Sequence, residues 1–300
     1  MLQRMKIASP LSRKATLVSV VISAWTARKL DKKVTREINQ SHGAAEDAGR
    51  YNKLLIEASR LTKLNGFISR ARNLHYKYTK PWSDTEGLRI LPNVLHEKFA
   101  SEFRKIKRDF DQAADEFCRD YPDYVRERVK ALNGLFDPKD YPAADEIRDK
   151  FKLETRTFPV PDAGDFRSDV LDEDTVEDIR RELADTSERV LDDAMKDSVD
   201  QIVKVVGHMA EKLKAYKITT GEKGKTTFFT ASLVDNVREL AELLPAFNLT
   251  NDPSFDQVAA RIKAELCVED AVALRDNDEA RKTVQKSAED ILKDVSKLLG

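Results

Sequence analysis

Cysteine, glycine and proline are scarce in this chain of 300 residues, which has 2, 10 and 10 of them respectively. Two cysteines cannot form the disulfide network that stabilises many small secreted proteins, so a reducing compartment fits best and we expect the cytoplasm. Cys118 and Cys267 both fall within helical patterns, where a small apolar side chain is the expected role. The few glycines and prolines, beside abundant Ala, Leu, Glu, Lys and Arg, favour long helices over a sandwich or barrel.

Long apolar runs are missing as well. The most apolar run, from Leu17 to Ile22, is interrupted by Ser19 and is far too short to cross a bilayer. Arg13 and Lys14 precede it as basic residues precede a signal peptide, but no small-residue cleavage pattern follows. We therefore expect no membrane partner.

The residue patterns of common active sites are also absent from the sequence. Acidic pairs such as Asp192-Asp193 fit solvated helix faces better than a carboxylate active site. Residues 221–227 resemble a phosphate-binding loop, but the glycines are wrongly spaced and a charged helix precedes them. We predict no catalytic residues, no metal ligands and no cofactor. None of the four histidines belongs to an H-x-x-x-H or H-E-x-x-H pair; they are His42, His75, His96 and His208.

Charged residues, by contrast, make up 35% of the chain, and their signs are unevenly distributed. Residues 1–80 hold 17 Lys or Arg and 5 Asp or Glu, whereas residues 169–300 hold 19 and 29. The formal net charge of −1 therefore conceals a basic first quarter and an acidic end. This distribution fits either an acidic partner for the first quarter or neutralisation by the chain's own acidic part.

Five cations of the first quarter recur along one expected helix. Apolar residues spaced by threes and fours predict a helix over residues 45–78, and the cations fall on its polar side. Spread over about 36 Å, they could follow a phosphate backbone without reading its sequence, with tyrosines nearby to stack on bases. The alternatives are an acidic protein partner and the chain's own acidic helix. The five are Lys53, Arg60, Lys63, Arg70 and Lys77.

The periodicity predicts a mainly α-helical fold, a helical bundle with a small β element. Four phenylalanines at helical spacing, Phe99, Phe103, Phe110 and Phe117, indicate a buried stripe on a helix that Asn93 begins. Strands are expected over residues 17–22, 88–91 and 153–160, the last at a sheet edge because prolines end it. Further helices are expected over 23–42, 121–133 and 143–151, with a turn at 80–84.

The acidic end of the chain predicts a long antiparallel arm. From Asp172 to Tyr216 the helical phase is unbroken, which predicts a helix roughly 65 Å long. Helices follow over residues 232–244, 253–267 and 278–299, and the last carries apolar residues at the 4-3-4-3 spacing of a coiled coil. This seam either packs back on the long helix or joins two copies of the chain. Its residues are Val284, Ala288, Ile291, Val295 and Leu298.

These elements suggest three consecutive segments. We expect residues 1–80 to form a basic strand-helix-helix segment and residues 81–168 a helical core with short strands. Residues 169–300 are expected to form an acidic segment that consists of the long helix and the C-terminal helices.

Two sequence words resemble a family of uncharacterised helical proteins from tailed phages and prophages. The first is W-T-x-R-K, at Trp25–Lys29, and the second is L-F-x-x-x-D-Y-P, at Leu135–Pro142. The resemblance covers about the first two thirds of the chain. The family has no established activity, so it implies no functional residues here. Some relatives occur beside genes for a MoxR-type AAA+ ATPase and a von Willebrand A-domain protein, which implies an accessory or adaptor role.

We therefore expect a non-enzymatic adaptor that acts through a protein partner in the host cytoplasm, with an AAA+ ATPase as one candidate and self-association as a further possibility. The alternative is a sequence-independent nucleic-acid-binding protein that uses the basic first quarter.

Overall fold

The computed structural model describes residues 11–82, 87–216 and 229–298. The chain forms two compact units, and each contains segments that are distant in sequence. Unit 1 holds residues 1–18, 78–96 and 157–300, and unit 2 holds residues 19–77 and 97–156. This division differs from the three consecutive segments expected above, because strands pair across long stretches of sequence.

The chain has one small four-stranded sheet. Its strand order is β4 (Lys80–Pro81), β5 (Arg89–Pro92), β1 (Ala15–Ser23) and β6 (Lys152–Pro159). Strands β4 and β5 and the first part of β1 belong to unit 1, whereas the end of β1 and most of β6 belong to unit 2. Residues Ala15–Val18 pair antiparallel with Pro92–Arg89, and a single helical turn, α1 (Leu11–Lys14), precedes β1. The strands expected near residues 17, 88 and 153 are confirmed, and β6 lies at the edge of the sheet as its proline predicted. Where a turn was expected at residues 80–84, Lys80 and Pro81 form strand β4, and residues 83–84 lie outside the described residues.

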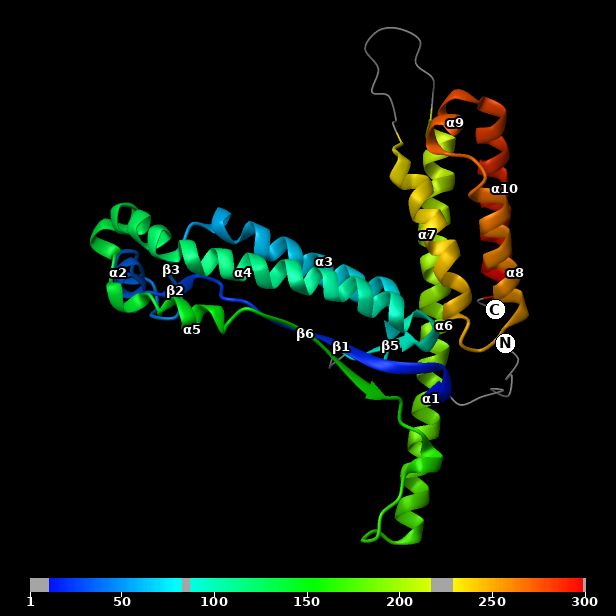
Figure 1. Cartoon of the computed structure of the whole chain (residues 1–300), viewed down its shortest axis with the longest axis horizontal. Coiled ribbons are helices and arrows are strands. Elements are labelled where there is room, and N and C mark those ends of the chain that lie inside the picture. Colours follow the sequence, from blue (N-terminus) through cyan, green and yellow to red (C-terminus); the bar gives the residue numbers. More distant parts are fainter. Residues whose placement is uncertain (1–10, 83–86, 217–228, 299–300) are drawn as a thin grey trace. The chain divides into compact units, whose positions relative to one another are not determined.

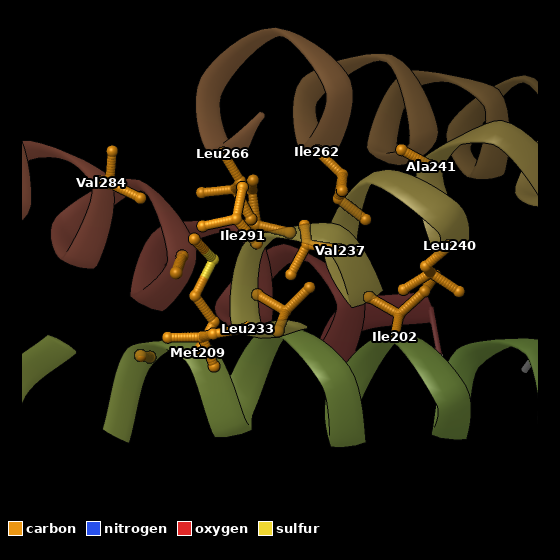
Figure 2. Close-up of a cluster of buried hydrophobic side chains, with 14 of the residues drawn as sticks. Ile202, Met209, Leu233, Val237, Leu240, Ala241, Ile262, Leu266, Val284 and Ile291 are labelled. Atoms are coloured by element: carbon orange, nitrogen blue, oxygen red, sulfur yellow. The ribbon is translucent and has the colours of Figure 1, made fainter. Parts of the chain in front are cut away.

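The core of unit 1 is a helical bundle built around α6 (Glu173–Ala215) (Figure 1). α6 and α10 (Asp278–Leu298) lie side by side and antiparallel, as the sequence predicted. Figure 2 shows how their side chains interdigitate with those of α7 (Ala231–Phe247) and of the helix that begins with α8 (Pro253–Arg261). The labelled core residues include Ile202, Met209, Leu233, Val237, Ile262 and Ile291.

The bundle differs from the expectation in one helix boundary, one π-helical turn and one additional helix. α7 continues through Pro245 to Phe247, because burial of Leu243, Leu244 and Phe247 outweighs the hydrogen bond that a proline removes. The helix that begins at Pro253 ends in a π-helical turn at Ile262–Leu266. A further helix, α9 (Ala271–Asp276), was missed; the Asp270 side chain caps it by accepting from the amides of Val272 and Ala273.

Unit 2 has its core along α4 (His96–Leu132). The four phenylalanines of the expected stripe are all buried there, and Phe151 packs edge-on against Phe117 with ring centroids 5.6 Å apart. The helix expected to restart after Tyr121 is instead a continuous part of α4, which passes through Pro122 and ends at Leu132. The other elements are β2 (Arg28–Leu30), α2 (Lys32–Ser41), β3 (Asn52–Leu54), α3 (Thr62–Tyr78) and α5 (Ala144–Arg148).

The predictions of helix over residues 23–42 and 45–78 are wrong for the first part of each range. Ala27 is buried and has a φ of 53°, a left-handed conformation that a helix cannot contain, and its carbonyl accepts the Leu55 amide at 2.7 Å. The strand pair β2 and β3 therefore replaces helix on both sides of this bond. α2 begins only after Asp31, which caps it, and α3 begins at Thr62 rather than near residue 45.

Two valines of α6 test the bundle core. Val206 is fully buried, whereas Val203, one turn away, is 42% exposed. Val206→Ala should lower the free energy of unfolding of unit 1 by about 2 kcal/mol. Val203→Ala should change it by less than about 0.5 kcal/mol. Both changes affect helix propensity equally, so urea denaturation followed by Trp82 fluorescence in a Trp25→Phe background isolates the burial effect. Equal effects would contradict the described packing.

Candidate functional site

A cluster of buried charges joins β2, β3 and the turn at Pro138–Asp140 in unit 2. The Lys53 Nζ atom lies 2.6 Å from Asp140 Oδ2 and 3.1 Å from Asp31 Oδ2, and it donates to the Leu135 carbonyl at 3.0 Å. The Lys53 and Asp140 side chains are each 7% exposed. Lys29 Nζ lies 2.8 Å from the other carboxylate oxygen of Asp140. The Lys53 ammonium group therefore has two carboxylates and one carbonyl within contact distance.

The register of the strand pair explains why a carboxylate is needed at this position. Lys29 on β2 lies directly opposite Lys53 on β3, so both side chains project from the same face of the ribbon. Two ammonium groups side by side repel each other, and the repulsion grows as water is removed. Asp140 offsets this repulsion because each of its oxygens forms an ion pair with one of the two lysines.

The compensation is visible in the direction of each pKa. Burial by itself would lower the pKa of Lys53, but the ion pairs with Asp140 and Asp31 outweigh it and raise the pKa above its ordinary value. Burial would raise the pKa of Asp140, but the ion pairs with Lys29 and Lys53 hold it below the ordinary value. The Val34 amide, followed by Lys53, lowers the pKa of Asp31. All three groups remain charged at neutral pH.

These findings correct the role predicted for Lys53. It lies on a strand rather than on a helix, and it is buried rather than facing solvent. It is paired with two carboxylates and its pKa is raised, so it is suited neither to contact phosphate nor to act as a nucleophile. The sequence could not reveal this, because its partner Asp140 is distant in the chain.

Four buried polar atoms in the same unit have no hydrogen-bond partner among the described residues: the hydroxyls of Tyr121 and Tyr141, the Nε atom of Arg128, and Asp140 Oδ2, whose contact with Lys53 is an ion pair. Arg128 Nη2 donates to the Leu54 carbonyl at 2.8 Å, which places its guanidinium beside β3. Burial raises the pKa of Tyr121 to about 12, and the Tyr141 hydroxyl nearby acts in the same direction. Both tyrosines are therefore protonated at neutral pH. Neither was singled out from the sequence, where both fall in stretches that read as helix or turn.

Three of the other four cations of the predicted stripe, Lys63, Arg70 and Lys77, recur every seven residues along one side of α3. Arg60 lies in a 3-10 turn and pairs with Glu127 at 3.0 Å, and Lys63 pairs with Glu116 at 2.5 Å. Arg70 is exposed and its guanidinium lies over the Phe67 ring, 5.3 Å from the centroid. Lys77 lies in the last turn of α3. Arg60 and Lys63 therefore face α4 rather than a free partner.

The acidic residues that pair with this stripe come from unit 2. Glu116 and Glu127 belong to α4, and Asp31 and Asp140 lie in the buried cluster. The expected neutralisation by the chain's own acids is therefore observed for three of the five cations, but the acids are not those of the long helix. Unit 2 as a whole holds 26 Lys or Arg and 20 Asp or Glu, whereas unit 1 holds 26 and 33.

The predicted interaction seam on the last helix lies inside the bundle of unit 1. Val284, Ala288, Ile291 and Val295 are all buried in the same cluster as α6 and α7 (Figure 2). The side chain of Leu298 lies outside the described residues, as do residues 221–227 with their glycine-rich pattern. Of the two arrangements left open by the spacing, the chain has the intramolecular one, so these four residues are not available to a partner.

Unit 1 has its own buried lysine, Lys80 on β4, which has no exposed side-chain surface. Its Nζ atom lies 2.9 Å from Asp197 Oδ2 and 2.9 Å from Gln201 Oε1, and 4.3 Å from the centre of the Phe247 ring. Burial lowers the pKa of Lys80 to about 8, although the Asp197 carboxylate acts in the opposite direction. One partly exposed carboxylate is insufficient to offset full burial.

A groove of about 850 Å³ in unit 1 brings together Ser296, His208 and Glu211, the residue types of a hydrolytic triad. A triad requires the histidine to hydrogen-bond both the nucleophile and the acid. The Ser296 hydroxyl instead donates to the Lys293 carbonyl at 2.7 Å, and no hydrogen bond joins His208 to either residue in the described structure. The groove therefore lacks the geometry of that reaction.

The remaining reactive groups do not form a site either. Cys118 and Cys267 are free and half-buried, and burial raises the pKa of both thiols, which disfavours the nucleophilic thiolate. Among the described residues, no three His, Cys, Asp or Glu side chains are placed to hold a metal ion.

The first half of α6 stands apart from the rest of that helix. From Val190 onward α6 carries a continuous series of buried side chains, but no side chain between Glu173 and Arg189 is buried. In Figure 1 this half extends beyond α7, α8 and α10, and the chain that follows β6 runs along it. We call residues 169–189 the acidic arm, because they hold nine Asp or Glu and three Arg.

No helix among the described residues is long and apolar enough to span a membrane. The chain matches no protein-family model, no curated protein and no solved structure.

The buried cluster of unit 2 can be tested by removing its central charge. Lys53→Met leaves Asp31 and Asp140 without their shared partner, so the free energy of unfolding of unit 2 should fall by about 3 kcal/mol or more. The matched change Lys63→Met breaks an exposed pair and should cost less than about 1 kcal/mol. In a Trp82→Phe background, Trp25 reports unit 2 alone, because it packs against Phe117 and Tyr121. A smaller loss for Lys53→Met than for Lys63→Met would contradict a structural role.

Lys80 should make the stability of unit 1 depend on alkaline pH. Its pKa is about 8 in the folded chain, whereas the ordinary lysine value of 10.5 applies to the unfolded chain, so the unfolded state binds more protons between these values. Stability contributed by this group is therefore complete above pH 10.5 and falls as the pH drops to about 8. Relative to Lys80→Met, the wild type should gain about 3 kcal/mol across that window.

Denaturation followed by Trp82 at several pH values measures this gain, and Lys204→Met, an exposed lysine of α6, is the matched control. A constant difference between wild type and Lys80→Met from pH 8 to 10.5 would show that Lys80 does not titrate there.

Proposed function

We propose that this chain is a non-enzymatic accessory protein that binds another protein through the acidic arm. One observation carries the proposal: the apolar periodicity of α6 continues through Val176, Ile179 and Leu183, yet these side chains remain only half-buried. A helix face that is apolar, projecting and incompletely covered by its own chain is typical of an interaction site.

The chemistry of the described residues supports a role without catalysis. The two buried lysines, Lys53 and Lys80, each donate to an acceptor of the chain. The serine, histidine and glutamate of the groove are not hydrogen-bonded to one another in the described structure. These lysines thus have partners within the fold, whereas most carboxylates of the acidic arm form no ion pair within the described chain.

The resemblance to phage proteins suggests where such a role would be exercised. Together with the scarcity of cysteine, it supports action in the cytoplasm of a host cell, with an AAA+ ATPase as a candidate partner. The interaction seam that the sequence predicted on α10 is buried, so it is not proposed as the binding surface.

Position-specific photo-cross-linking tests the proposed function. A photoreactive amino acid at Glu182, within the acidic arm, should give a discrete protein adduct in cells that produce the chain. The same amino acid at Val272, an exposed residue of α9, should not. The adduct should survive nuclease treatment. Equal adducts from both positions, or none from Glu182, would overturn the proposal.

A second candidate, nucleic-acid binding, is favoured by the excess of cations in unit 2, of which Lys32, Lys33 and Arg36 on α2 are exposed. We expect this reading to fail, because three of the five stripe cations already have carboxylate partners. Fluorescence anisotropy with single-stranded DNA decides. Binding at low salt that weakens steeply with added salt, and that is lost in a Lys32→Glu, Lys33→Glu, Arg36→Glu variant, would establish it instead.

A further inference from the structure

The acidic arm carries charges that its own residues do not neutralise. Each of its three arginines is engaged locally: Arg181 pairs with Asp178 at 3.1 Å, and Arg180 donates to the Phe166 carbonyl at 3.1 Å. Arg189 donates to the Asp185 backbone carbonyl and to Thr186. Seven of the nine carboxylates form no ion pair with any described residue of the chain; they are Asp169, Asp172, Glu173, Asp174, Glu182, Asp185 and Glu188. The arm therefore presents a negative field toward solvent.

An apolar stripe runs between these charges. At 100° per residue, Val176, Ile179 and Leu183 span about 60° of the helix, and Glu173 and Glu182 lie about 60° beyond its two edges. Just before the helix, Val170 is 92% exposed and Leu171 is 42% exposed. A single exposed valine is common on protein surfaces, but two adjacent exposed apolar residues close in sequence to a half-buried stripe add to the apolar surface of the arm.

We infer that the acidic arm binds a basic amphipathic helix of another protein, a prediction that rests on the proposed function above. The apolar side of such a helix would cover Val176, Ile179 and Leu183, and its flanking Lys or Arg side chains would meet Glu173 and Glu182. Residues 173–189 extend over about 25 Å, which matches a partner helix of four to five turns. Nucleic acid is disfavoured because a phosphate backbone and the acidic arm repel each other.

Sequence and electrostatics together favour this partner over an uncharged one. An uncharged apolar helix would bury the stripe, but it would leave the flanking carboxylates partly desolvated and without a counter-charge. A basic helix removes that cost and is also attracted from a distance, so that its association is faster at low salt.

Anisotropy titrations of the full chain with two synthetic peptides test the inference. One peptide places Leu on one helix face and Lys on the other; the second has the same composition with Leu distributed around the helix. The first should bind at least tenfold more tightly. Ile179→Ser should reduce that affinity about tenfold, and Glu173→Gln with Glu182→Gln should reduce both the affinity and its dependence on salt. Val203→Ser, an exposed apolar site of α6 outside the acidic arm, should change it less than twofold.

A second substitution guards against loss of structure. Val170 lies outside the helix and is almost fully exposed, so Val170→Ser cannot disturb packing, yet it should weaken binding of the amphipathic peptide. Equal binding of the two peptides would reduce the interaction to net charge and overturn the inference. Salt-sensitive self-association that Ile179→Ser abolishes would also overturn it, because the occupant would then be a second copy. A nuclease-resistant adduct at Glu182 without peptide binding would overturn this inference while leaving the proposed function intact.

Discussion

The structure of unit 1 depends on one continuous helix, α6, whose 43 residues extend over about 65 Å. A straight helix cannot fold its apolar stripe inward on itself, so every turn must find a separate partner. The stretch around Val190 to Ala194 meets the small sheet, and the stretch from Val199 to Leu213 meets α7 and α10. The first half has only the preceding loop beside it. The acidic arm is thus the part of the stripe that the chain itself does not fully cover, and the functional proposal follows from that geometry.

Two buried lysines show how local compensation determines the behaviour of a charge. Lys53 has two carboxylates and a carbonyl as acceptors, so its pKa is raised and the ammonium group joins strand to turn as a permanent ion pair. Lys80 has one partly exposed carboxylate, an amide oxygen and an aromatic ring, so burial prevails and its pKa falls to about 8. The two lysines differ both in the number of full negative charges within contact distance and in the depth of burial, which is greater for Lys80.

The periodicity of the sequence predicted those elements that can be recognised from the local spacing of apolar residues. α6, α10, the phenylalanine stripe of α4 and the edge strand β6 were expected because their spacing needs no long-range information. Pro122 and Pro245 lie inside helices because buried neighbours outweigh the lost hydrogen bond, a balance that a local rule cannot evaluate. The residues around Lys53 read as helix, yet form a strand, because Ala27 bonds Leu55 and Asp140 receives two lysines. Such pairings exist only once distant segments meet.

The uneven distribution of charge between the basic first quarter and the acidic end therefore has two separate consequences. Within unit 2 the excess cations are largely structural where they are buried or paired, as at Lys53, Arg60 and Lys63. Within the acidic arm the carboxylates lie beside apolar side chains that are incompletely covered, and seven of the nine have no described ion-pair partner. A charge that already has a partner contributes little to recognition, because a new contact must first break the existing one. Recognition is therefore expected where unpaired charge and uncovered apolar surface coincide, and in the described residues that coincidence lies on the first half of α6.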